Sequence, residues 1–513
     1  MAIRFVPRVP SADRLGRWSP LAVAVVALAL RLHGLGDKPL WLDEVSTLHR
    51  ATVGFAAMVA DSLHSKHYPT YFALIWPVAK LGSSVWLLRL PSAIFGAFNA
   101  ALICIIGREA DRPATGIAAG LLLALSPFDV QYGQEARSYT LVAALILVAL
   151  WGLVRLARLA ARPETLPGTS ARAAWLAYGA GTLGALLVLN VAVPWLVASN
   201  IAAFAIAWRA TEHRAAFLKH WAAMQAVIIV LWLPALAAVF YDSKGAVLEG
   251  PGWALPEKWA ALWSIIGPVY LDRISAFITF DVLPAKVPGL SLALAALAAY
   301  GGWRLRRVPH ALIVVGCAAC VPPLLLLLVS RVTPVLVPRY FAWSAAPFFI
   351  LAGAGIAGLT RWRYAAALTA FVLVALVNLE PYYHAETKPR WDLAAARLAA
   401  ESGPGDVVLF NSWDAYYVTT AYARQSGLDQ RHLALTWKPA EAARLAPGHG
   451  LWVVFGRAGQ GKMVQPADYV ALVSWLGQPA SEQRIGRYIT IWRFAAPDAL
   501  ANAADTDKGR KPN

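Results

Sequence analysis

Two adjacent carboxylates, Asp43 and Glu44, lie just after the first long apolar segment of the chain, with His67 further along the same hydrophilic stretch. A carboxylate can accept the proton of an attacking hydroxyl, and it is ionised at neutral pH because the ordinary pKa of Asp is about 3.9. Neighbouring side chains point apart in a strand or a helix, so these two acids cannot easily face each other across one glycosidic bond. The pair argues against a two-carboxylate hydrolase and leaves two readings, a single general base or the acids of an ordinary solvated loop.

Two further polar clusters interrupt apolar segments, at 126–139 (SPFDVQYGQEARSY) and at 338–340 (PRY). In the topology that the loop charges favour, their arginines lie on the outer side of the membrane, against the usual distribution of positive charge. Either these guanidinium groups snorkel to lipid headgroups, or they bind an anionic lipid head, because guanidinium matches phosphate bidentately.

Two other patterns are interpreted as structural. Residues 456–462 (GRAGQGK) nearly match a phosphate-binding loop, but Met463 stands where the metal-binding Ser or Thr belongs, and Pro466 disfavours the helix that should follow. Cys317 and Cys320 have the spacing of a redox or zinc pair, yet they lie in an apolar segment without a second pair nearby. We expect neither pattern to carry chemistry.

The elements that position these residues are predicted to be membrane helices. The chain is 58% hydrophobic and 15% charged, and its apolar residues occur in long runs that are almost free of charge. A helix needs about 20 apolar residues to cross roughly 30 Å of hydrocarbon. One ionised side chain near the centre costs roughly 2.5–3.5 kcal/mol on insertion scales, so such runs indicate lipid surroundings. We therefore predict a polytopic membrane protein.

The net charge of +17 lies largely in short loops, such as those of Arg108, Arg112 and Arg304, which argues for membrane orientation and against nucleic acid as a partner. With these loops in the cytoplasm, the chain crosses the membrane about eleven times, its N-terminus inside and its C-terminal domain outside. The first span is expected to be an uncleaved anchor, because Arg31 and His33 follow it without a small-residue cleavage site. The expected spans are 18–33, 89–107, 114–130, 139–154, 173–190, 194–208, 220–240, 286–303, 309–330, 340–359 and 364–381.

The predicted membrane domain covers residues 1–383, with long outer segments at 34–88 and 241–285, the second of them rich in tryptophan. The stretch 68–81 is short for a span and is expected to be an interfacial or re-entrant helix. Strand and helix patterns alternate over 384–500, which predicts a small soluble α/β domain in the periplasm. The expected strands are 406–411, 432–437, 451–455 and one within 485–494, the expected helices are 392–401, 414–425 and 467–476, and the tail 501–513 is expected to be disordered.

Five short motifs occur in order over most of residues 20–350. Together they resemble the bacterial glycosyltransferases of the GT-C superfamily, in the group of the lipid A aminoarabinose transferases and the rhizobial lipopolysaccharide galacturonosyltransferases, which is similar to the dolichyl-phosphate-mannose protein mannosyltransferases. The chain departs from the family pattern at Tyr68, where members have proline, and in the last motif around Tyr340. The motifs are 42–44 (LDE), 67–71 (HYPTY), 89–96 (RLPSAIFG), 126–139 and 339–341 (RYF).

The resemblance implies the inverting transfer of a sugar from a polyprenyl-phosphate donor to a lipid, polysaccharide or protein acceptor at the periplasmic face of the bacterial inner membrane. Asp43 matches the acid that is the proposed base in this family, a role that contributes about 10²–10⁴-fold to a rate. The leaving lipid phosphate needs stabilisation of its growing negative charge. The residues implied are Asp43 and Glu44 for catalysis, Arg137, Tyr139, Arg339 and Tyr340 for the lipid phosphate, and His67, Tyr71 and Glu135 for positioning the substrate or a metal.

No cofactor is certain from the resemblance. Metal use varies in the superfamily, so a divalent cation is an option, but a carboxylate with one or two histidines does not name a metal.

A transporter or flippase of lipid-linked sugars is the alternative function, because polar corners inside a helical bundle also line substrate paths. Transporters usually carry polar or broken helices near the membrane midplane and internal repeats. Here the polar residues gather toward one face and no repeat is evident. A non-catalytic scaffold whose outer domain binds a partner is the third reading.

Overall fold

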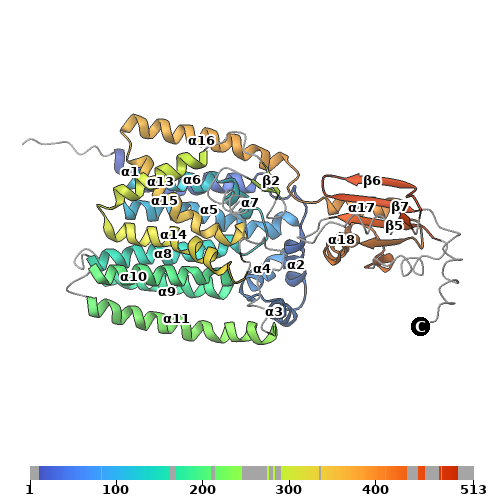
Figure 1. Cartoon of the computed structure of the whole chain (residues 1–513), viewed down its shortest axis with the longest axis horizontal. Helices are drawn as coiled ribbons and strands as arrows, with labels where there is room; N and C mark the ends of the chain where they lie inside the picture. Colours follow the sequence, from blue (N-terminus) through green and yellow to red (C-terminus); the bar gives the residue numbers. More distant parts are fainter. Residues whose placement is uncertain are drawn as a thin grey trace, which may run out of the picture. The chain divides into compact units, whose positions relative to one another are not determined.

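The computed structural model forms two compact units (Figure 1). The membrane unit comprises Met1–Leu35, Arg50–Ser275 and Thr279–Ala385, and the sheet unit comprises Gly36–His49, Ala276–Ile278 and Glu386–Asn513. The segment Gly36–His49 thus belongs with the C-terminal part of the chain, although it precedes most membrane helices in sequence. The residues that the structure describes are 11–82, 84–161, 168–209, 214–244, 274–276, 281–283, 290–333, 335, 337–410, 412–435, 449–456, 473–474 and 477–494.

The membrane unit is a bundle of long apolar helices. In the described part of the chain, 8 helices are long and apolar enough to cross a membrane. Their positions match eight of the expected spans. They are α5 (Val85–Ala110), α8 (Tyr139–Ala161), α9 (Gly168–Val188), α10 (Val193–Arg209) with the 3-10 turn η2 (Asn190–Ala192), α11 (Arg214–Asp242), α14 (Pro309–Val329), α15 (Ala342–Ala357) with the 3-10 turn η4 (Pro338–Phe341), and α16 (Arg361–His384).

The expected span 114–130 is broken in the structure. Helix α6 (Pro113–Leu125) meets α7 (Pro127–Gly133) at a bend of 63°, and counting this pair as one span raises the number to 9. The bend follows from Pro127, which cannot continue the hydrogen-bond ladder of α6 but is well placed in the first turn of a new helix. The side chain of Ser126 caps this new helix by accepting a hydrogen bond from the backbone N–H of Asp129.

Helices also occupy the other two expected spans, as α1 (Ser11–Leu32) and α13 (Leu290–Leu305). Neither is among the described helices that qualify as spans. The expected number of eleven crossings is therefore not confirmed.

Glycines let two helices of the bundle approach closely. A Cβ atom on Gly301 of α13 would overlap the carbonyl oxygen of Leu351 in α15, and one on Gly355 of α15 would overlap that of Leu297 in α13. The next residue along α13, Gly302, has no such neighbour within 4 Å. Small residues at helix interfaces are a common means of close packing in membranes, where lipid gives little hydrophobic drive for association.

The segment 34–88 is mostly helical. It contains α2 (Leu42–Thr52), α3 (Phe55–His64) and α4 (Thr70–Leu81), and α4 lies where a short interfacial or re-entrant helix is expected. The strands β1 (Ile274–Ala276) and β2 (Asp281–Leu283) form a separate two-stranded sheet.

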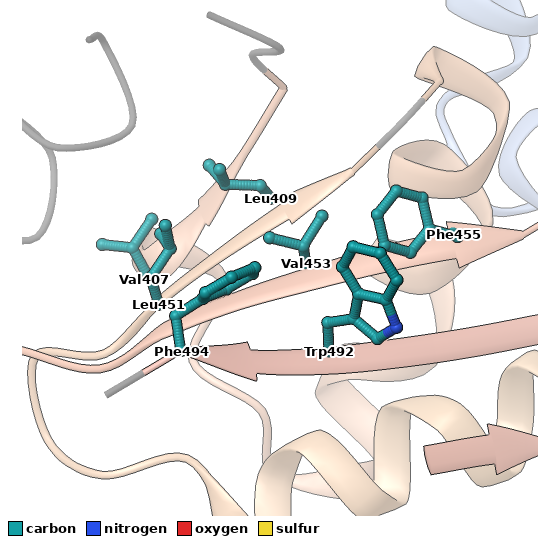
Figure 2. Packing of buried hydrophobic residues seen from close by; sticks show 7 residues of the cluster. All are labelled: Val407, Leu409, Leu451, Val453, Phe455, Trp492 and Phe494. Atoms are coloured by element: carbon teal, nitrogen blue, oxygen red, sulfur yellow. The ribbon is translucent and has the colours of Figure 1, made fainter. Parts of the chain in front are cut away.

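The sheet unit is built on five strands in the order β4-β3-β5-β7-β6. Strand β3 pairs parallel with β4 and β5, whereas β7 pairs antiparallel with β5 and β6. Alternate residues of three strands place their side chains on one face, as the two-residue period of a strand requires (Figure 2). This core consists of Val407, Leu409, Leu451, Val453, Phe455, Trp492 and Phe494.

The helices α17 and α18 and the strands β3 and β5 follow the expected ranges, whereas β4 covers only two residues of the strand expected at 432–437. The single strand expected within 485–494 is the second half of a hairpin, whose turn contains Gly486 at φ +59. The elements are β3 (Val407–Phe410), β4 (Leu433–Ala434), β5 (Leu451–Gly456), β6 (Ser481–Ile485) and β7 (Ile489–Phe494), with α17 (Trp391–Glu401) and α18 (Trp413–Ser426). Outside the described residues lie Trp253, Trp259, Trp263 and Tyr270, residues 457–462, most of the expected helix 467–476, and the tail 501–513.

Candidate active site

Asp43 and Glu44 lie in the first turn of α2, where the free backbone N–H groups of a helix favour negative charge. The turn is closed by the carbonyl of Trp41, which accepts hydrogen bonds from the backbone N–H groups of Glu44 and Val45, both at 2.9 Å. The side chain of Asp43 is half-buried, whereas Glu44 is 0% exposed. The two acids are therefore neighbours in sequence but differ in access to a substrate.

Glu44 forms a buried ion pair inside the sheet unit. Its Oε2 atom lies 2.7 Å from the Nζ atom of Lys388, and the exposed fractions of the two side chains are 0% and 4%. Burial of a charge is costly unless a partner compensates it, so the ammonium group of Lys388 accounts for an ionised Glu44 at this depth. The half-buried Asp43 is thus the acid of this pair that is better placed for chemistry.

Helix α18 packs beside the segment that carries Asp43. The backbone N–H of Leu40 donates a hydrogen bond to the hydroxyl of Tyr422 at 2.6 Å. Burial raises the pKa of Asp414 in the first turn of α18, and the charge of Asp43 raises that pKa further. The sequence gives no signal for these neighbours, because their separation along the chain is more than 300 residues.

Arg137 lies in the connection between α7 and α8. Its side chain is 7% exposed, and its Cζ atom lies 6.0 Å from the ring centre of Tyr139. The hydroxyl of Ser92 donates to the Arg137 carbonyl at 3.2 Å, and the Arg137 N–H donates to the carbonyl of Glu135 at 2.8 Å. These contacts fix the backbone that presents the predicted phosphate ligands.

A buried amide anchors the same connection to two other helices. The side-chain nitrogen of Gln134 donates to the carbonyl oxygens of Arg31 and His33 at 3.0 and 2.6 Å. Its side-chain oxygen accepts a hydrogen bond from the hydroxyl of Tyr382 in α16 at 2.8 Å. The polar corner predicted from sequence is therefore a fixed part of the membrane unit, joined to the ends of α1 and α16.

Arg339 and Tyr340 lie in η4, immediately before α15. The Arg339 side chain is 8% exposed, and its Cζ atom lies 6.0 Å from the ring centre of Tyr340. Both predicted arginines are thus largely buried and each stands near an aromatic ring. Each guanidinium group can bind phosphate oxygens bidentately, and the role of both arginines at a phosphate stays a prediction.

His67 and Tyr71 meet around one phenylalanine in the membrane unit. The rings of both lie close to Phe72, at centroid distances of 6.0 and 5.6 Å. The guanidinium of Arg50 covers the same phenyl ring at 4.7 Å and binds Asp61 through Nε at 2.6 Å. The predicted positioning residues therefore belong to one aromatic and charged cluster.

Sequence reasoning missed the role of Arg31, which it used only to exclude signal-peptide cleavage. This side chain is 0% exposed and donates to the carbonyl oxygens of Ala27 and Ala124 at 3.0 and 3.2 Å. It passes directly over Gly96 and Gly133, where any Cβ atom would collide with it. Glycines in the RLPSAIFG motif and in the polar corner are the only sequence signal for this buried arginine.

Metal binding stays a prediction at this site. Among the residues that the structure describes, no group of three or more His, Cys, Asp or Glu side chains is arranged to hold a metal ion.

The fold is similar to those of solved structures at low sequence identity. The structure of ArnT from Cupriavidus metallidurans in the apo state matches with a TM-score of 0.61 at 14% identity, over 94% of this chain and 98% of that one. ArnT bound to undecaprenyl phosphate matches over the same shares with a TM-score of 0.57. The Archaeoglobus fulgidus oligosaccharyltransferase tethered to an acceptor peptide has a TM-score of 0.52 at 13% identity, over 90% of this chain and 71% of that one.

Neither a protein-family model nor a curated protein sequence matches the chain. The structural likeness nevertheless gives the fold. The chain is a polytopic α-helical membrane protein with the GT-C fold and a small C-terminal sheet, as its motifs predict.

Proposed function

We propose that this chain is an inverting glycosyltransferase, which moves a sugar from a polyprenyl-phosphate donor to an acceptor hydroxyl at the periplasmic face of the bacterial inner membrane. The observation that carries the proposal is the fold shared over 94% of the chain with ArnT, of which one structure holds undecaprenyl phosphate. The acceptor classes remain a lipid, a glycan or a protein, all of which can offer a hydroxyl group.

Asp43 is the proposed general base. The acceptor oxygen attacks the anomeric carbon while Asp43 takes its proton, and the bond from that carbon to the phosphate oxygen breaks. One displacement inverts the anomeric configuration and needs a single base without a carboxylate nucleophile. This requirement fits the pair in α2, of which Glu44 is buried against Lys388 and Asp43 is half-buried. Glu44 then serves to hold the turn that presents Asp43.

Arg137 and Arg339 are the proposed ligands of the lipid phosphate. The phosphate gains negative charge as the glycosidic bond breaks, and fixed cations in a site with little water stabilise such charge strongly. Arg137 and Arg339 are 7% and 8% exposed, so solvent screens their charges weakly. Tyr139 and Tyr340 carry hydroxyl groups that can donate to the same oxygens, while Glu135, His67 and Tyr71 are proposed to position the donor.

The test uses the purified full chain in lipid nanodiscs with radiolabelled polyprenyl-phosphate sugars and a bacterial envelope extract. We expect label to leave one donor and to enter the extract covalently, with inverted anomeric configuration. Label that stays on every donor, while donor crosses the bilayer of proteoliposomes, would instead identify a flippase.

A further inference from the structure

One exposed aromatic pair stands on the surface of the sheet unit. Trp413 is 54% exposed and stacks on Tyr417, with ring centres 4.8 Å apart and planes inclined by 10°. The two residues are four positions apart in α18, so they share one face of that helix. Every other tryptophan described in the sheet unit is buried: Trp41, Trp391, Trp452 and Trp492.

The aromatic pair borders the segment that carries the proposed base. The ring of His49, on α2, meets Tyr417 edge-on at 6.4 Å. Asp414, which follows Trp413, interacts electrostatically with Asp43. All of these residues belong to the sheet unit, so the aromatic pair and both acids share one compact body.

Two buried contacts hold the segment around Asp43 to other parts of the sheet unit, one to Tyr422 of α18 and one to Lys388. The Leu40–Tyr422 hydrogen bond and the Glu44–Lys388 ion pair lie on either side of Asp43 in sequence, and both are buried. The side chain of Ser412 caps α18 by accepting from the backbone N–H of Ala415, which fixes the turn of Trp413 and Asp414. The exposed indole is therefore presented by a rigid support and is not part of a loose loop.

We propose that Trp413, Tyr417 and Asp414 form a subsite for an uncharged sugar ring of the acceptor, beside Asp43. The inference rests on the proposed function, because an acceptor hydroxyl must reach hydrogen-bond distance of the base. A sugar ring has an apolar face of C–H groups and an edge of hydroxyls. The exposed indole of Trp413 suits the apolar C–H face of the sugar. The carboxylates of Asp414 and Asp43 can accept hydrogen bonds from its hydroxyl groups.

The charge around the subsite selects among acceptors. Asp43 and Asp414 interact electrostatically, and ionised carboxylates here repel a uronate or a phosphorylated sugar, because like charges brought together at an interface oppose binding. Uncharged sugar rings are not repelled by these carboxylates, and their hydroxyl groups can still donate hydrogen bonds to them. We therefore expect an uncharged hexose or pentose next to the reacting hydroxyl, in place of an anionic one.

Saturation-transfer NMR on the full chain tests this subsite without requiring any transfer reaction. The probes are methyl glycosides of glucose, galactose, mannose and arabinose, with methyl glucuronide as the anionic comparison. Lipid nanodiscs replace sugar detergents, whose headgroups would compete, and empty nanodiscs give the background. We expect a signal from at least one neutral glycoside and a weaker one from the glucuronide.

Trp413→Ala should lower the neutral-glycoside signal about tenfold, on the scale of a lost stacking contact, and Trp413→Phe should keep part of it. The control is Trp362→Ala, which removes a 68% exposed tryptophan of the membrane unit and should leave the signal unchanged. A signal that survives Trp413→Ala, a preference for the glucuronide, or no signal from any neutral glycoside would overturn the proposal.

The outcome also separates this inference from the proposed function. Glycoside binding that depends on Trp413, in a protein that transfers no sugar from any donor, would keep the subsite and reject the transferase. Sugar transfer by a protein whose glycoside binding is unchanged in Trp413→Ala would keep the transferase and reject the subsite.

Discussion

The two acids in the first turn of α2 carry the same charge but stand in different surroundings. Glu44 is enclosed with Lys388, and taking two ions out of water is repaid only when both partners stay in place. Asp43 keeps access to solvent and lies near Asp414. At the scale of single residues, one carboxylate therefore stabilises the turn and its neighbour is available to accept a proton.

Lys388→Met should destabilise the sheet unit by about 3–5 kcal/mol, because it leaves the buried carboxylate of Glu44 without its cation. Pairing it with Glu44→Leu should recover much of this loss, since both charges are then removed. The melting temperatures of the single and double variants measure the coupling. Arg431→Ala, at the exposed pair with Asp429, is the control and should change the melting temperature little. A double variant as unstable as Lys388→Met would contradict this account of the pair.

Arg137→Ala should raise the KM for the polyprenyl-phosphate donor roughly 10- to 100-fold, the scale of a lost charged hydrogen bond. Arg137→Lys should restore only part of the affinity, because an ammonium cannot bind phosphate bidentately. Initial rates over a range of donor concentrations give the two constants. The exposed Arg172 provides the control, Arg172→Ala, with an unchanged KM. If the donor KM of Arg137→Ala equals that of the wild type, Arg137 does not belong to the phosphate site.

Residue types alone predict which side chains can do chemistry. They do not show which of two adjacent residues has a catalytic role and which has a structural one. Asp43 and Glu44 are equivalent in the sequence, and only the approach of Lys388, 344 positions away, separates them. The same limit hides Trp413 and Asp414, which come next to α2 through the fold. Arg137 and Arg339 are conspicuous in the sequence as charged residues within apolar surroundings, and their role at a phosphate stays a prediction.

At the scale of elements, the close approach of α13 and α15 depends on two glycines. Gly301→Ala should force these helices apart, because the added methyl group overlaps the Leu351 carbonyl. Gly302→Ala is the matched control one position along α13, with no neighbour within 4 Å. It should be neutral or stabilise by up to about 1 kcal/mol, as expected for Gly to Ala in a helix. Melting temperatures in nanodiscs compare the two, and equal values would argue against tight packing at Gly301.

The start of β3 is tied to β5 by one carboxylate. Asp406 accepts hydrogen bonds from the Trp452 indole and from the backbone N–H groups of Gly403 and Gly450, at 2.9, 2.9 and 2.7 Å. Burial by itself raises the pKa of Asp406, but these donors and the charge of Arg493 outweigh it and hold that pKa below its ordinary value of 3.8.

A lowered pKa makes this stabilisation dependent on pH. The carboxylate stabilises the folded state above its ordinary pKa, and the contribution is lost as the pH falls through the lowered pKa of the folded state. The melting temperature of the wild type should therefore exceed that of Asp406→Asn at neutral pH, with a gap that closes below about pH 4. A gap that stays constant down to acid pH would show that Asp406 acts through shape and not through charge.

Element types follow well from the sequence wherever apolar runs are long. Eight expected spans are helices of sufficient length, whereas 114–130 breaks at Pro127 because the proline and the Ser126 cap begin a new helix. Strand β6 escaped detection because its residues, Ser481 to Ile485, are mostly polar and only partly buried. A helix as short as α2 is marginal by itself and depends on tertiary contacts.

At the scale of the whole molecule, the chain divides into a membrane unit and a sheet unit, and the second includes the segment that carries Asp43. The sequence predicts a membrane part and an α/β part, because hydropathy and strand patterns change near residue 383. It does not predict that Gly36–His49 joins the C-terminal part, since this grouping rests on contacts between distant positions such as Leu40 and Tyr422.

The measurement that tests the central claim most directly is the rate of sugar transfer by Asp43→Asn beside Asp37→Asn. Both variants remove one negative charge from the same segment, and Asp37 is exposed and has no assigned role. We predict that Asp43→Asn lowers kcat by about 10²–10⁴-fold with little change in donor KM, while Asp37→Asn keeps the wild-type rate. Full transfer activity in Asp43→Asn would contradict the assignment of the base and the mechanism built on it.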